Sequence, residues 1–175
     1  MEEIIIKVNN KHYNFKFVQQ IKVEKLRTFT EEELQAHINK GRLVKSLQNI
    51  EYNIENIKKV EFCRFRLDEE IIDSGVYIWR INGETRYIGS AKNLKERFNN
   101  GYGIISPRNI FYGGQSTNCK MNLVVVNNQA KKIEIYFYKT EEYREAKSVE
   151  KIILQSFKNN EQDVAWEELY NIKSL

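Results

Sequence analysis

Residues 75–89 read GVYIWRINGETRYIG, and this stretch sets how the middle of the chain folds. The apolar run at residues 76–81 predicts a strand. Asn82-Gly83 is a strong signal for a two-residue hairpin turn, and residues 85–89 then predict the strand that pairs with the first. The centre of the chain is therefore expected to be an antiparallel hairpin.

Patterns on either side of this hairpin extend the prediction to an α+β fold. Apolar and polar residues alternate at residues 133–138, which predicts a third strand. A helical pattern begins at residue 141, and a last short helix is expected at residues 164–172. We therefore expect a small three-stranded antiparallel sheet flanked by helices.

The first third of the chain is predicted to be a folded extension. Residues 4–17 alternate around an Asn9-Asn10 turn, which predicts a β-hairpin. Thr30 and Glu33 have the spacing of a helix capping box. We expect an N-terminal β-hairpin plus helix extension over residues 1–72, with a role in DNA binding or specificity, and a second domain over residues 73–175.

Composition favours a protein of the cytoplasm. The chain of 175 residues is 41% hydrophobic and 30% charged, and no apolar run approaches the roughly 20 residues of a membrane span. The start of the chain lacks a basic segment followed by an apolar core, so neither a secretory signal nor a membrane partner is expected. Cys63 and Cys119 have no metal-site spacing and are expected to be ordinary thiols in a reducing compartment.

Positive charge is concentrated in one part of the chain. Residues 1–74 hold 13 Lys and Arg against 13 Asp and Glu, whereas residues 86–132 hold eight basic residues against the single acid Glu96. A local field of this sign suits a polyanionic substrate, although a solvated basic face has the same composition.

Residues 99–122 are rich in glycine, asparagine and other small polar residues, which predicts a long loop. Arg108, Asn118 and Lys120 within it are candidates for contacts to phosphates and groove edges. The alternative is a flexible surface loop without a substrate.

Two tripeptides and two later residues give the chain a resemblance to a known family. Gly75-Val76-Tyr77 and Tyr87-Ile88-Gly89 resemble the paired motifs of the GIY-YIG nucleases, with valine in place of the first isoleucine. Arg97 follows in a basic segment with helical spacing, and Glu150 follows much later. The resemblance covers about residues 73–160 and implies a metal-dependent endonuclease.

The resemblance also implies a role for each residue of the set. Tyr77 would deprotonate or orient the attacking water, and Tyr87 would bind the water or the phosphate. Arg97 would clamp a phosphate oxygen through its planar fork of donors. Glu150 would hold one divalent ion, Mg2+ or Mn2+, with waters and the phosphate completing the shell.

Further residues are candidates for the same site. Many family members have His or Tyr four residues after the arginine, where this chain has Gly101, and Tyr102 is its expected replacement. Asn160 is the candidate for the asparagine that usually ends the family's core. Lys92 and Lys95 are candidates for phosphate contacts, with solubilising surface lysines as the alternative.

The expected function is hydrolysis of DNA phosphodiester bonds, and a restriction-like enzyme fits the chain best. The substrate is expected to be double-stranded DNA, and cleavage of both strands would call for a homodimer or for sequential nicking. The alternatives are a homing, mobile-element or repair-type nuclease, a catalytically silent nucleic-acid-binding module, and a scaffold protein. In the last two, both tyrosines would be ordinary strand aromatics.

Overall fold

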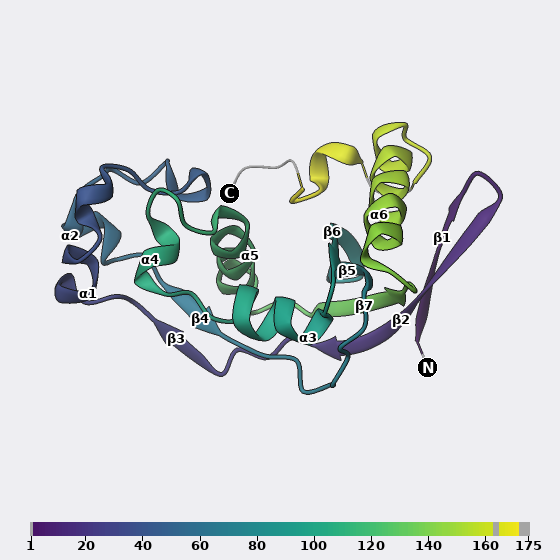
Figure 1. The fold of residues 1–175 in the computed structure, drawn as a ribbon, viewed down its shortest axis with the longest axis horizontal. Coiled ribbons are helices and arrows are strands. Elements are labelled where there is room, and N and C mark those ends of the chain that lie inside the picture. The colour runs from purple at the N-terminus through teal and green to yellow at the C-terminus, as the bar shows by residue number, and fades with distance from the viewer. Residues whose placement is uncertain (1, 163–164, 172–175) are drawn as a thin grey trace. The chain divides into compact units, whose positions relative to one another are not determined.

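The computed structural model describes residues 2–162 and 165–171, which form two compact units (Figure 1). The first, here called the sheet unit, has its described residues within Met1–Ile21, Leu67–Arg97 and Ala130–Ser174. The second, here called the helical unit, comprises Lys22–Arg66 and Phe98–Gln129. Each unit is built from segments that are far apart in the sequence.

The sheet unit contains a five-stranded antiparallel sheet with the order β1-β2-β7-β5-β6. Its strands are β1 (Glu3–Val8), β2 (Lys11–Gln20), β5 (Gly75–Ile81), β6 (Glu84–Ala91) and β7 (Ile133–Lys139). The α+β class is as expected, but the predicted small three-stranded sheet is wrong. The N-terminal hairpin is two strands of the same sheet, not an extension outside it.

Strand β2 joins the sheet because β7 would otherwise present an unpaired apolar edge. Phe17 pairs with Tyr136 and Lys16 with Phe137, with a bulge after Phe17. An exposed edge of alternating apolar residues is a hazard for aggregation, and the long β2 covers it. The pairing joins segments more than 100 residues apart, so local patterns could not predict it.

Both predicted hairpin turns are present. Asn9 and Asn10 have φ of 48° and 62°, and Asn82 and Gly83 have φ of 50° and 84°. Positive φ at both central residues is typical of the type I′ turn, whose twist matches that of paired strands. The turn chemistry of the sequence therefore set the register of both hairpins.

Helix α6 (Tyr143–Lys158) covers one face of the sheet. Ala146, Val149, Ile153 and Phe157 recur at helical spacing and pack on a cluster that includes Val76. The predicted helix after residue 141 is confirmed. The described part of the expected 164–172 helix is the single turn η4 (Trp166–Glu168), and its remainder lies outside the described residues.

The helical unit is built from short elements. They are β3 (Lys25–Arg27), α1 (Glu31–Gln35), η1 (Ile38–Lys40), η2 (Lys45–Leu47), α2 (Ile54–Ile57), β4 (Phe62–Arg64), α4 (Pro107–Ile110) and α5 (Ser116–Asn127). The predicted capping box is confirmed, since the backbone N–H of Glu33 donates to Thr30 Oγ1 at 3.2 Å.

The long loop predicted at residues 99–122 is wrong. This region contains α4 and most of α5, and Cys119, Met121 and Val124 are buried on α5. Its asparagines suggested a loop because asparagine disfavours helix interiors. Burial of the apolar residues between them outweighs that local preference.

Asn122 on α5 is fully buried and holds two segments of the helical unit together. Its Oδ1 accepts from the N–H of Cys63 at 2.9 Å, and its Nδ2 donates to the carbonyls of Cys63 at 2.8 Å and Tyr102 at 2.7 Å. We expect Asn122→Ala to lower the free energy of unfolding by about 3 kcal/mol, because buried polar groups lose their partners. Urea denaturation measures this, with exposed Asn127→Ala on the same helix as the control. Equal stability of the two variants would contradict the expectation.

The two cysteines are free thiols, and both are buried. Burial raises the pKa of Cys63 and of Cys119 to about 12. At pH 8 roughly one thiol in ten thousand is then ionised, so we expect negligible reaction of the native protein with a thiol reagent. Both thiols should react in denaturant, and rapid labelling of the native protein would contradict the buried positions.

No helix within residues 2–162 and 165–171 has the length and apolar composition needed to cross a membrane.

Candidate active site

Tyr77 lies directly opposite Gly89 in the ladder between β5 and β6. A Cβ atom at residue 89 would lie 2.5 Å from Tyr77 Oη and 2.6 Å from its Cζ. Such distances are far inside van der Waals contact, so the tyrosine ring lies against bare glycine backbone. The glycine of the second motif therefore makes room for the tyrosine of the first.

Replacing Gly89 by alanine should displace the Tyr77 ring. We expect a loss of about 1–3 kcal/mol in the free energy of unfolding, as in other overpacked sites. A double-mutant cycle with Tyr77→Leu tests the cause, because alanine at residue 89 should cost much less once the ring is absent. The same cost in both backgrounds would show that the ring is not what requires glycine.

Gly75 of the first motif is constrained in a similar way by β7. A Cβ there would lie 2.3 Å from the carbonyl oxygen of Tyr138 and 2.5 Å from Cζ of Phe137. The glycine thus lets β5 and β7 approach closely where β5 begins. Close packing therefore explains why both motifs have glycine at these positions, whether or not the site is catalytic.

The two motif tyrosines and the arginine are brought together. Arg97 Nε lies 3.5 Å from Tyr77 Oη, at the outer limit of a hydrogen bond. The rings of Tyr77 and Tyr87 have centroids 6.3 Å apart, and the two tyrosines are 1% and 8% exposed. This cluster places a guanidinium beside a phenol hydroxyl.

Local capping positions Arg97. The side chain of Asn93 accepts from the N–H of Glu96 at 2.8 Å and so begins α3 (Leu94–Glu96), which continues into the π-helical turn η3 (Arg97–Tyr102). Ser90, three residues before Asn93, is not the cap of this helix. It belongs to β6.

Ser90 instead contacts Glu150. The Ser90 hydroxyl donates to Glu150 Oε2 at 2.5 Å, and the carboxylate of Glu150 is half-buried. Val149 and Ile153 on α6 pack on the sheet and hold the helix in place. Sequence reasoning missed Ser90, because nothing in the sequence links residues that are 60 positions apart.

These two groups of residues meet at β6, an edge strand of the sheet. Successive residues of a strand face opposite sides, so Gly89 faces Tyr77 while Ser90 faces α6 and Glu150. The Tyr77 hydroxyl therefore lies against Gly89, and the Glu150 carboxylate lies against Ser90, which is the next residue of the same strand. The candidate site lies around this edge rather than on one face.

The predicted lysine contacts differ from each other. Lys95 forms an ion pair with Glu70, and this contact lowers the pKa of that carboxyl group. Lys92 is exposed, with its Nζ 5.6 Å from the ring centroid of Tyr143, over which Lys147 also lies at 5.2 Å. Lys92 therefore shares a small cationic cluster with α6.

Four other predicted residues belong to the helical unit. Tyr102 is fully buried, and its ring packs edge-to-face on Phe98 at 5.4 Å. Asn118 is 4% exposed and donates to Gln115, whereas Arg108 is exposed. Burial and the neighbouring Lys45 lower the pKa of Lys120.

Asn160 lies in the sheet unit, exposed and just beyond the end of α6. Its φ of 57° is in the left-handed region, which asparagine tolerates better than most residues. The residue thus has a local role in ending the helix.

The described residues contain no group of three or more His, Cys, Asp or Glu side chains that could hold a metal ion. The expected site needs one carboxylate, with waters and substrate oxygens as the other ligands. Glu150 and the neighbouring Ser90 hydroxyl supply hard oxygen donors, and the half-buried carboxylate leaves room for water. The donor chemistry fits Mg2+ or Mn2+.

Comparison of the chain with known protein families, with curated proteins and with solved structures finds no match.

Proposed function

We propose that the protein is a divalent-metal-dependent endonuclease that hydrolyses DNA phosphodiester bonds, restriction-like in its action, with the edge of β6 as its active site. The observation that carries the proposal is the arrangement around Gly89 and Ser90. It holds the Tyr77 hydroxyl and the Arg97 guanidinium beside one residue and the Glu150 carboxylate beside the next.

Arg97 is proposed to bind the scissile phosphate. Its guanidinium stays charged at any working pH and offers several donors in one plane, which suits the oxygens of a phosphate in the transition state. Tyr77, whose Oη lies 3.5 Å from Arg97 Nε, is proposed to orient or deprotonate the attacking water.

Glu150 is proposed to hold the metal ion, and Ser90 fixes the carboxylate by donating to Oε2. When bound, a divalent ion would polarise the phosphate and stabilise the leaving oxygen. Tyr87 is proposed to position the water or the phosphate. A homodimer would allow both strands to be cut.

A catalytically silent nucleic-acid-binding module is the second candidate. The buried positions of Tyr77 and Tyr87 favour it, since both tyrosines then have structural roles. A cytoplasmic location remains part of either proposal.

Incubation of supercoiled plasmid with the wild-type protein in Mg2+, Mn2+ or EDTA tests the proposed function. We expect nicked or linear plasmid with either metal and intact plasmid in EDTA. Discrete fragments would support a restriction-like enzyme. Intact plasmid under all conditions, together with salt-dependent DNA binding, would contradict the enzyme and support the binding module.

A further inference from the structure

A groove in the sheet unit runs along α6 and reaches Glu150. It has a volume of about 490 Å³, and its lining comes from α6 and from η4. The residues that line it are Lys147, Glu150, Lys151, Leu154, Gln155, Lys158 and Trp166. The proposed metal ligand is thus a wall residue of a larger groove.

Three lysines in this groove are exposed and have no carboxylate partner among the described residues. Lys147, Lys151 and Lys158 form no ion pair there, and their spacing puts them along one side of α6. Lys95 and Lys139 of the sheet unit, by contrast, pair with Glu70 and Asp73. The groove therefore carries three lysines that no ion pair among the described residues neutralises, beside the single carboxylate of Glu150.

The row of lysines has the length of a short stretch of polynucleotide. Lys147 and Lys158 are 11 residues apart, which at 1.5 Å per residue is about 16 Å. One strand of nucleic acid advances about 3.4 Å per nucleotide, so the row spans about five nucleotides.

Trp166 adds an aromatic surface to the same groove. It is half-buried, packed in part on the core cluster of the sheet unit, and it lines the groove together with Leu154. A cationic groove with an aromatic platform is typical of single-strand binding, in which bases stack on the ring. Bases paired in a duplex have no free face to offer to Trp166.

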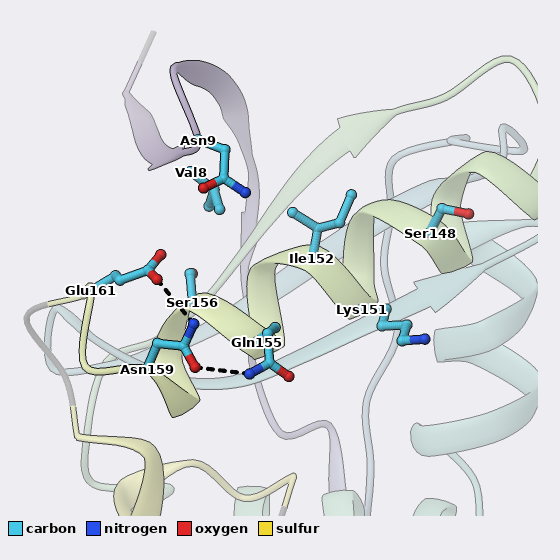
Figure 2. Close-up of a pocket in the computed structure, with 9 residues that line it drawn as sticks. All are labelled: Val8, Asn9, Ser148, Lys151, Ile152, Gln155, Ser156, Asn159 and Glu161. Carbon is cyan, nitrogen blue, oxygen red and sulfur yellow. Dashed lines mark hydrogen bonds between the residues drawn. The ribbon is translucent and has the colours of Figure 1, made fainter.

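A second cavity of about 410 Å³ lies on the side of α6 toward the β1–β2 turn, and it differs in chemistry. Three of its polar side chains bond to one another, because Gln155 donates to Asn159 and Asn159 donates to Glu161, as the dashed lines in Figure 2 show. Lys151 borders this cavity too, but its side chain points away from Asn9 (Figure 2). The groove at Glu150, whose three lysines form no ion pair among the described residues, is therefore the better candidate for binding a polyanion than this second cavity.

We infer that this groove binds a single-stranded segment of the nucleic-acid substrate, with its phosphates on the three lysines and a base on Trp166, next to the bond cleaved at Glu150. The inference rests on the proposed function for its last clause and names an unpaired strand as part of the substrate. Binding itself requires only the charge and the ring.

Fluorescence anisotropy with a labelled single-stranded 20-nucleotide DNA tests the inference, with its duplex as the second probe and EDTA present to prevent cleavage. We expect tighter binding of the single strand. We expect Lys147→Gln/Lys151→Gln/Lys158→Gln to lower the slope of log affinity against log salt by about 2, because each lost phosphate contact removes about 0.7.

The matched control removes three lysines from the hairpin of the same unit. Lys7, Lys11 and Lys16 are exposed, and their replacement by glutamine changes net charge equally. This control should leave the salt slope unchanged. An equal reduction of the salt slope in both triple variants would overturn the inference, because net charge alone would then explain the binding.

Trp166→Ala should weaken single-strand binding about 5- to 100-fold, the range for loss of one stacked base. Trp166→Phe keeps an aromatic surface and should bind nearly as the wild type. Quenching of tryptophan fluorescence by DNA should disappear in Trp166→Phe, since Trp79 is fully buried. Unchanged affinity in Trp166→Ala, or preference for the duplex, would overturn the inference.

These results are separable from the proposed function. Groove-dependent binding by a wild-type protein that cuts no DNA would support the groove and contradict the nuclease. If the protein cut DNA with a metal ion but bound it equally well without the three lysines and Trp166, the nuclease would be supported and the groove contradicted.

Discussion

Replacing Glu150 by alanine is expected to reduce DNA cleavage by at least about 1000-fold, because the proposed site has a single carboxylate ligand. The described residues contain no group of three or more His, Cys, Asp or Glu side chains that could hold the ion in its place, so we expect no compensation for the loss. Single-turnover nicking of plasmid DNA in Mg2+ measures the effect. DNA binding in EDTA should change little, since removal of one negative charge does not weaken contacts to phosphate.

Glu167→Ala is the control for this variant. Glu167 is an exposed carboxylate in η4 of the same unit, and its removal changes net charge by the same amount. We expect it to cut as the wild type does. Full activity of folded Glu150→Ala protein would remove Glu150 from the mechanism and, with it, the proposed metal site.

Replacing Arg97 by alanine is expected to lower the cleavage rate about 100- to 1000-fold, the usual cost of losing one donor to a developing charge in the transition state. Arg97 Nε also lies 3.5 Å from Tyr77 Oη, so its loss removes this contact with the group proposed to act on the attacking water. Arg97→Lys keeps the charge but not the planar fork and should give an intermediate rate. The rate at saturating DNA should fall more than the affinity does.

Arg144→Ala serves as the matched control for Arg97. Arg144 is exposed on α6 and has no ion pair among the described residues. If Arg144→Ala and Arg97→Ala reduced cleavage equally, a general effect of positive charge would explain the result. The contact between Arg97 and Tyr77 would then have no role in catalysis.

Local sequence was sufficient for the parts of the fold that depend on short-range chemistry. Asn82-Gly83 set the β5–β6 hairpin, and the Thr30–Glu33 spacing set the start of α1. Helix α6 followed from its apolar period. Each of these depends on residues within a few positions of one another.

Local sequence patterns could not predict the pairing of strands that are far apart in the sequence. The N-terminal hairpin joins the sheet through β2 and β7, whose strands are more than 100 residues apart. The helix α5 was mistaken for a loop because asparagines such as Asn118 and Asn122 carry a local turn preference. In the folded chain both are buried and hydrogen-bonded, which local propensity does not register.

The candidate site, like the fold, was predicted only in part. The family resemblance implied that Tyr77, Tyr87 and Arg97 share one site, and the structure brings these three together. The contact of Ser90 with Glu150 depends on how α6 lies on the sheet, so no local signal identified it. The packing reason for Gly89 likewise emerged only from the ladder between β5 and β6.

The central claim is that the groups held at Gly89 and Ser90 hydrolyse a phosphodiester with the aid of one divalent ion. The most direct test is single-turnover cleavage of supercoiled plasmid by the wild type, Glu150→Ala and Arg97→Ala, each in Mg2+ and in EDTA. We predict nicking by the wild type in Mg2+ and loss of at least about 99% of that rate in both variants. Equal metal-dependent nicking by all three folded proteins would contradict the claim, as would the absence of nicking by wild-type protein that binds the plasmid.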